Sequence, residues 1–354
     1  MNQIPVRRDT RQRGLTLIEL MVGLTISLVV LSALTTFFVS SLRNRAELNR
    51  ANELVENGRF TVRTLVSDLQ LAGYLAEFNI TDAITNPAGA LAMPADLPAA
   101  CATDPAQLRL GLAFPLQGFD DPVASPLDCI SDWRAGTDVV VVRRVSTCAI
   151  GEAGCGDVAG APYFQVSRCN AVTEIQGASN LWFDLDTDLA ELDRTARDCA
   201  TLAARRRYRT HIYFVANNDL AGDGVPTLKR AELRGGDFSI EPLANGVENL
   251  QIEYGIDTNG DGAPDQYSTN PSTFGACGAA ACRMANWRNV TVVKFNLLIR
   301  SLTESRSGAS VAKTFTLGRD VNGDAVTAGP FSDGYKRHAF QSVVMLKNVV
   351  GQRR

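Results

Sequence analysis

The most regular cluster of oxygen-bearing side chains in this 354-residue chain lies in a glycine-rich loop. Its first, third, fifth and ninth positions are Asp257, Asn259, Asp261 and Asp265. With Gly262 at the sixth position for a sharp turn, they match much of a calcium loop. The twelfth position holds Ser268 instead of a bidentate glutamate, so another carboxylate or a water would have to complete the shell. The alternative is a hairpin loop whose Asp and Asn side chains cap their own backbone. Calcium is the single candidate cofactor.

Catalytic motifs are not found in the sequence. There is no GxSxG elbow and no phosphate-binding loop, and the two histidines, His211 and His338, lie far apart with no nucleophile beside them. The run from Asp320 to Asp324 repeats the acidic spacing of the first loop, but Ala325 stands where glycine is needed, so it is interpreted as a turn. We therefore predict that the protein is not an enzyme.

The eight cysteines point to disulfides. They are Cys101, Cys129, Cys148, Cys155, Cys169, Cys199, Cys277 and Cys282. An even number and several short separations favour local loop closures, and sequential pairing is the first expectation, although the sequence alone does not fix connectivity. Zinc is the competing interpretation, but no CxxC occurs and only two histidines are available.

One carboxylate, Glu19, stands at the head of a long apolar stretch. From Leu20 to Leu42 there is no charge and no proline. As a helix, these residues would extend about 34 Å, enough to cross the hydrocarbon core of a bilayer. The basic leader before Gly14 would remain in the cytoplasm by the positive-inside tendency, which leaves the rest of the chain outside. An ionisable group beside the hydrocarbon region is costly unless it is paired or lies at the interface.

The residues from Gly14 to Glu19 resemble the class III signal of type IV prepilins. The resemblance implies that a prepilin peptidase cuts after Gly14, that Leu15 becomes a methylated amino terminus, and that Glu19 meets the amino terminus of a neighbouring subunit. Leu15 stands where most family members carry phenylalanine. An ordinary signal anchor with Glu19 at the interface is the plain alternative.

The apolar span is predicted to continue as an amphipathic helix as far as residue 72, with Gly73 at its end. Small or apolar residues recur there in steps of three and four: Leu48, Ala51, Val55, Gly58, Val62, Leu65, Leu69 and Ala72. This stripe should pack on the protein's own head, with a coiled-coil partner as the alternative. Charged residues, from Arg43 to Asp68, appear in the same part of the helix.

The remainder is predicted to form an antiparallel β-rich head on which the long helix lies, which gives an α+β, pilin-like fold. The expected strands are 108–114, 138–145, 208–216, 227–233, 247–256, 289–301 and 339–350. A loop of turn-forming residues between 216 and 227 predicts a hairpin.

A second resemblance, to the PilW type of minor pilin, is spread over this part of the chain. Its segments are Ile212–Val215, Gly246–Gly255, Trp287–Val290 and Met345–Asn348. The predicted parts are then a leader (1–14), a membrane and filament-core helix (15–42), its amphipathic continuation (43–78) and a periplasmic or extracellular head (79–354).

The resemblance implies a minor pilin that helps initiate or cap a type IV pilus and supports twitching motility or adhesion. Its partners would be a prepilin peptidase, the major pilin, other minor pilins and a tip adhesin. The protein would lie in the inner membrane before assembly and in the pilus at the cell surface afterwards. Removing the leader, which carries four arginines and one aspartate or +3, changes the net charge from −3 to −6, so nucleic acid is not an expected partner. The alternatives are a type II secretion pseudopilin and a pilin-anchored, calcium-dependent adhesin.

Overall fold

A single long helix, α1 (Leu17–Leu69), begins the structure. The computed structural model describes residues 14, 16–80, 91, 93–122, 125–169, 171, 174, 182–305 and 312–352. The chain divides into two compact units, Met1–Ala51 and Asn52–Arg354, and each is described by itself. The helix ends three residues earlier than predicted, and the turns that follow reach Gly73, whose φ of +72° suits glycine.

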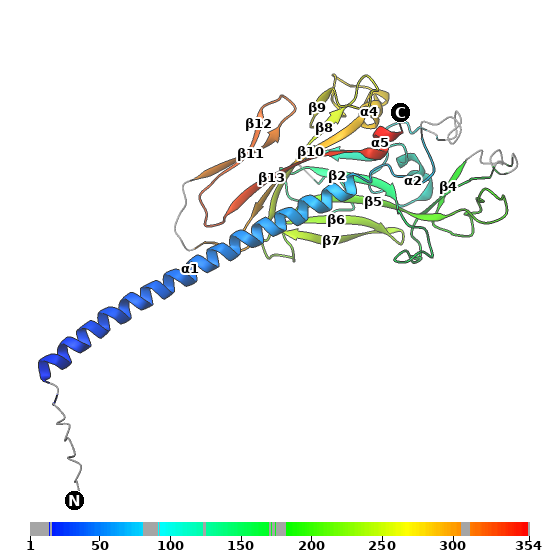
Figure 1. Ribbon diagram of the computed structural model, residues 1–354. Coiled ribbons are helices and arrows are strands. Elements are labelled where there is room, and N and C mark those ends of the chain that lie inside the picture. Colours follow the sequence, from blue (N-terminus) through cyan, green and yellow to red (C-terminus); the bar gives the residue numbers. More distant parts are fainter. Residues whose placement is uncertain are drawn as a thin grey trace, which may run out of the picture. The chain divides into compact units, whose positions relative to one another are not determined.

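The larger sheet of the second unit contains seven antiparallel strands (Figure 1). They are β1 (Leu116–Phe119), β2 (Val139–Val145), β3 (Tyr163–Val166), β4 (Phe183–Asp186), β5 (Arg205–Ala216), β6 (Thr227–Arg234) and β7 (Asp237–Asn245). The central strand is β5, which pairs with β2 along one edge and with β3 and then β6 along the other. The predicted hairpin between β5 and β6 is confirmed.

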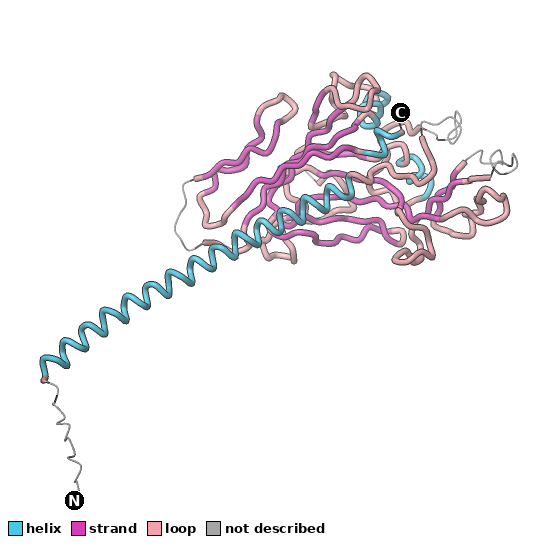
Figure 2. Tube along the Cα trace, in the orientation of Figure 1, coloured by secondary structure: helices cyan, strands magenta, loops and turns pink. Residues whose placement is uncertain are grey.

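The second sheet has the order β13-β10-β8-β9 and is also antiparallel. Its strands are β8 (Val247–Ile256), β9 (Gln266–Ser268), β10 (Val290–Arg300) and β13 (Arg337–Met345). A separate hairpin of β11 (Lys313–Arg319) and β12 (Ala325–Phe331) contacts this sheet through Gly318, which lies against Glu253 and Asn296. The run from Asp320 to Asp324 forms the turn of that hairpin, as predicted. Figure 2 distinguishes these strands from the short helices and loops.

The strand predicted at 108–114 was wrong, and the strand predicted at 339–350 was right in its first part but extended too far. Residues 105–111 form α2 (Pro105–Gly111), since Asp104 accepts the N–H groups of Ala106 and Gln107 and Pro105 suits a first helical turn. At the carboxyl end the strand stops at Met345, and α5 (Lys347–Gly351) follows. Another helix, α4 (Ala280–Arg288), and the strands β1, β3, β4, β7, β9, β11 and β12 were not predicted.

The main hydrophobic core joins the second half of α1 to both sheets. Leu54, Leu65 and Leu69 of the helix are buried with side chains from β2, β5, β8 and β10. At Gly58 the helix comes so close to β13 that an added Cβ would overlap the ring of Phe340. The predicted stripe begins later than expected, since Leu48 is 64% exposed and the first fully buried helix residue is Leu54. The α+β class with an amphipathic helix on antiparallel sheets is confirmed.

The carboxyl-terminal segment closes the end of α1. The Asn348 side chain donates to the carbonyl oxygens of Gln70 (3.3 Å) and Ala72 (3.2 Å). These carbonyls follow the last helical turn and lack helical partners, so the amide satisfies groups that would otherwise be buried without a hydrogen bond. The end of the chain thus fixes the helix where it leaves the core.

Candidate functional site

The first turn of α1 contains a reciprocal cap. The Thr16 N–H and the Thr16 hydroxyl both donate to the same carboxylate oxygen of Glu19, each at 2.9 Å. The Glu19 N–H in turn donates to the Thr16 hydroxyl oxygen at 3.3 Å. This is a capping box, and the Thr-x-x-Glu spacing that signals it was overlooked in the sequence analysis. Gly14 is exposed, and Leu15 lies outside the described residues.

The cap holds the Glu19 carboxylate at the amino-terminal end of the helix, where the helix dipole favours a negative charge. Cleavage after Gly14 would create an ammonium group one residue before Thr16 by covalent structure alone. Each processed subunit would therefore carry an ammonium group and a carboxylate four residues apart in sequence, and the implied pair joins the carboxylate of one subunit to the ammonium group of another. The carboxylate remains exposed and accessible to a second chain.

The apolar part of α1 is uncovered by the rest of the described chain. Its most hydrophobic 18-residue window has a mean hydropathy of 2.3 and none of it is buried, and by length and composition the helix could cross a membrane. The large side chains are 38–79% exposed from Leu17 to Leu42. A continuous apolar surface of this length requires lipid or other helices to cover it.

Hydroxyl groups in this apolar stretch bond to their own helix. The side chains donate to carbonyl oxygens three or four residues earlier, at 2.6–2.9 Å, and belong to Thr25, Ser27, Ser32, Thr35 and Thr36. Such internal bonds leave these donors satisfied without water. The stretch can therefore enter an apolar environment despite its polar side chains.

A buried polar network lies under the second half of α1, centred on Asp68. Its carboxylate accepts from Arg144 Nε of β2 at 2.7 Å and from the Tyr213 hydroxyl of β5 at 2.8 Å. The second β5 partner is His211, whose Nδ1 lies 2.6 Å from the Asp68 carboxylate. Asp68 is a charged residue of the helix, yet it is only 5% exposed. Its position three residues after Leu65 and four before Ala72 is the signal that places it on the buried face.

A second carboxylate, Glu232 of β6, lies on the far side of His211. The distance from His211 Nε2 to Glu232 is 3.6 Å, and that carboxylate also accepts from Arg209 at 2.6 Å and Arg234 at 2.8 Å. Because Nε2 faces a carboxylate instead of a hydroxyl or thiol, the arrangement differs from an Asp–His–nucleophile relay. The network links the helix to the sheet, and sequence reasoning missed it.

Both carboxylates are held in their charged forms. Burial by itself would raise the pKa of Asp68, but His211 and Arg144 outweigh it and hold that pKa well below its usual value of 3.8. Burial likewise opposes ionisation of Glu232, yet His211 and Arg234 hold its pKa well below 4.5. Ionised carboxylates with several donors each can remain buried at neutral pH.

The acidic loop at residues 257–265 hydrogen-bonds to itself. Asp257, which is 1% exposed, accepts from the N–H groups of Gly260 (2.6 Å) and Gly262 (2.9 Å). Asp261 accepts from Ala263 N–H at 2.8 Å, and Asp265 accepts from the Thr258 N–H and hydroxyl at 2.7 Å each. In the described part of the chain, there is no group of three or more His, Cys, Asp or Glu side chains that could hold a metal ion. The arrangement matches the self-capped alternative, and calcium binding stays an untested prediction.

We expect Asp257→Ala to lower the free energy of unfolding by about 1–3 kcal/mol, because two backbone donors, one of them on buried Gly262, lose their acceptor. Asp261→Ala is the control, since its carboxylate is exposed and caps one N–H. The difference in melting temperature between Asp257→Ala and Asp261→Ala, measured on the full-length protein, should be the same in calcium and in a chelator. A melting temperature of the unmodified protein that rises with calcium, and no longer does so in Asp261→Ala, would establish the calcium site instead.

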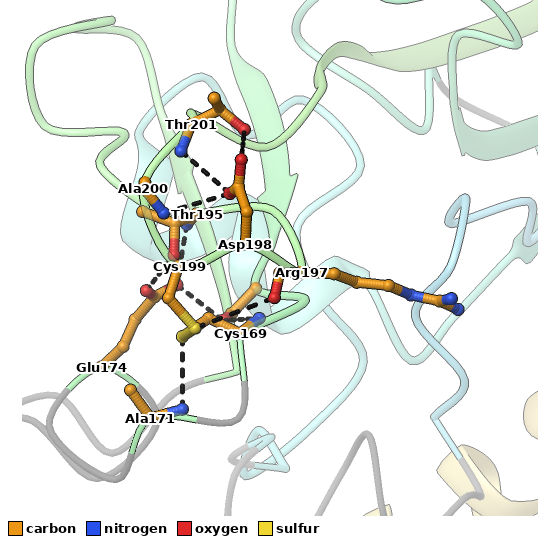
Figure 3. Close-up of a disulfide and its surroundings, with 10 residues drawn as sticks. Cys169, Ala171, Glu174, Thr195, Arg197, Asp198, Cys199, Ala200 and Thr201 are labelled. Carbon is orange, nitrogen blue, oxygen red and sulfur yellow. Dashed lines mark hydrogen bonds between the residues drawn. A yellow bond between two sulfur atoms is a disulfide. The ribbon is translucent and has the colours of Figure 1, made fainter.

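The eight cysteines form four disulfides. The pairs are sequential, which is the arrangement that the sequence analysis put first: Cys101–Cys129, Cys148–Cys155, Cys169–Cys199 and Cys277–Cys282. The first and third close separations of 28 and 30 residues and so constrain the unfolded chain most. Figure 3 shows Cys169–Cys199 with Asp198 and Glu174, which accept hydrogen bonds from the N–H groups of Thr201 and Thr195 respectively. Disulfides are typical of oxidising compartments.

Two protein families match this chain, one at the start of α1 and the other in the β-rich head. The family described as the prokaryotic N-terminal methylation motif matches residues 9–35, which contain Gly14, Thr16 and Glu19. The family described as type IV pilus-assembly protein W matches residues 212–348, from β5 to α5. Together the two matches support a type IV pilus pilin of the PilW type. The second match includes most of the β5–β6 hairpin and the sheet of β8, β10 and β13 that packs on the second half of α1.

No curated protein matches this chain. Among solved structures, a type IV-like pilin from Thermus thermophilus is similar at 13% identity, covering 84% of this chain and 98% of that one, with a TM-score of 0.35. A structural similarity this low supports no conclusion about the fold or function of this chain. The identification rests on the two family matches.

Proposed function

We propose that this PilW-type pilin is a minor subunit that helps to initiate or cap a type IV pilus. The observation that carries the proposal is the uncovered apolar half of α1, which begins at a capped carboxylate and has its hydroxyl groups satisfied internally. Lipid would cover this surface before assembly, and the helices of other subunits would cover it in the filament. The function is then structural, and Glu19 is the group that meets a partner's amino terminus.

The proposal defines the order of events and the partners. The precursor would lie in the inner membrane with its disulfide-bonded head in the periplasm, and a prepilin peptidase would cut between Gly14 and Leu15. The processed protein would then join the major pilin and other minor pilins, with a tip adhesin as a further partner. Twitching motility or adhesion would depend on it through the pili that it helps to form.

Deletion of the gene, with complementation by a tagged copy, tests this role. The turn between β11 and β12 can carry the tag, since Val321 is 59% exposed and the turn lies outside both sheets. We expect surface pili to fall at least tenfold on deletion, to return with the tagged copy, and to bear immunogold label at one end. The tag should leave pilus number unchanged relative to an untagged copy.

Two outcomes would contradict the proposal. Immunogold label repeated along the whole pilus shaft would show that the protein is a major component. Normal piliation together with loss of secreted enzymes would make it a type II secretion pseudopilin.

A further inference from the structure

A small cavity lies where the loop closed by Cys148–Cys155 covers the first half of β5. Its volume is about 210 Å³, and it is lined by Ser146, Tyr163, Arg207 and Arg209 together with the loop itself. The two arginines alternate with Tyr208 along the strand, so both project to the same face of the sheet. The cavity belongs to neither the first turn of α1 nor the acidic loop.

The guanidinium groups around this cavity outnumber the carboxylates. Glu232 lies within 4 Å of four arginines, and Glu241 pairs with two of the same four, Arg230 and Arg234. Four arginines against two glutamates leave two positive charges. Asp157 lines the cavity as well, but it is exposed and its charge is screened by solvent. Arg207 and Arg209, which line the cavity, share Glu232 with two other arginines and are therefore only partly neutralised, in a protein whose net charge is negative.

The donors of the cavity are incompletely satisfied. Arg207 donates Nη2 to the Leu233 carbonyl at 2.8 Å, while its buried Nε has no hydrogen-bond partner among the described residues. A buried donor without an acceptor costs free energy and commonly marks the place of a water or an ion. Burial lowers the pKa of Arg209, and the charge of Arg207 lowers it further although Glu232 opposes this. A bound anion would relieve both features.

We propose that this cavity binds an oxyanion: the sulfate, phosphate or carboxylate group of a ligand outside the chain. Guanidinium groups present paired donors that fit such groups, and partial burial strengthens the interaction relative to water. A volume of about 210 Å³ suits one oxyanion group or a single acidic sugar unit and is too small for a larger ligand to enter entirely. The rest of a larger ligand would remain in solvent.

Titration of the full-length protein in detergent tests the proposal, with sodium sulfate, sodium phosphate and sodium glucuronate as separate probes at constant ionic strength in chloride. We expect a saturable rise in melting temperature and a saturable calorimetric signal with at least one probe. The probe that binds most tightly distinguishes a tetrahedral anion from a carboxylate. Arg207→Gln should weaken binding about tenfold or more. Arg206→Gln is the control, because Arg206 is adjacent in sequence and does not line the cavity.

A second pair of variants keeps the test valid if Arg207→Gln does not fold. Gly156 lines the cavity, has no atoms within 4 Å of an added Cβ, and does not have a positive φ, so it tolerates a side chain. Gly156→Glu should weaken binding by placing a carboxylate in the cavity, whereas Gly156→Gln should weaken it less. Binding that is absent with all three probes, or equal in the unmodified protein and both charge-altering variants, would overturn the proposal.

Discussion

Replacing Glu19 with alanine is expected to remove the protein from pili while leaving it in the membrane. The substitution deletes the acceptor of the Thr16 N–H and the only carboxylate in the first turn of α1. Loss of the cap costs about 0.5–2 kcal/mol of local helix stability. Loss of the charge removes a partner for an ammonium group in an apolar environment, where attraction is strong. Fractionation, blotting of sheared pili and electron microscopy give the readout.

Glutamine at position 19 separates the two roles. A Thr-x-x-Gln sequence still forms a capping box, so Glu19→Gln keeps the helix start but lacks the charge. If the charge pair is what assembly requires, both variants should reduce surface pili by at least tenfold. If the cap alone matters, the glutamine variant should assemble normally. Glu53→Gln, which changes an exposed carboxylate farther along the same helix, is the control.

Normal piliation with Glu19→Ala, in a cell where gene deletion abolishes pili, would show that the carboxylate has no assembly role. Failure of the variant to be processed would instead assign Glu19 to recognition by the peptidase. Migration of the precursor and the processed protein on gels distinguishes these results.

The largest effect on stability is expected at Asp68. Asp68→Ala leaves Arg144, His211 and Tyr213 without their shared acceptor in a buried site, and removal of one member of such a network costs about 3–5 kcal/mol. We expect the midpoint of denaturant unfolding, measured on the full-length protein in detergent, to fall accordingly. Glu53→Ala is the control on the same helix and should change the free energy of unfolding by about 0.5 kcal/mol or less. A similar loss in both variants would contradict the role assigned to the network.

The same network predicts acid sensitivity. The pKa values of Asp68 and Glu232 are lowered from 3.8 and 4.5, so the unfolded state binds protons first as the pH falls. Their stabilisation is therefore complete above about pH 5 and is lost progressively below the unfolded values. Asp68→Asn, which keeps the shape but does not ionise, should show a flatter decline between pH 5 and pH 3. An identical pH profile for Asp68→Asn would contradict this explanation.

The sequence by itself determined the features that depend on neighbours along the chain. The apolar run from Leu20 to Leu42, the signal from Gly14 to Glu19 and the repeating small residues of the helix are local patterns, because a helix has a fixed period of 3.6 residues. The buried strands at Val139–Val145 and Val290–Arg300 were equally visible as runs of β-branched residues. These patterns were sufficient for the α+β class and for the family resemblance.

The tertiary structure decided what depends on residues far apart in the sequence. Asp68 meets His211 across 143 positions, and Asn348 reaches the end of α1 across 276. Charged residues such as Asp68 and Glu232 look solvent-exposed in sequence, and only the donors that surround them make their burial favourable. The apolar half of α1 was predicted from the sequence as a membrane span. The cap on Glu19 was found only in the structure, and the buried polar network that fixes the other half of the helix to the sheets depends on the tertiary fold.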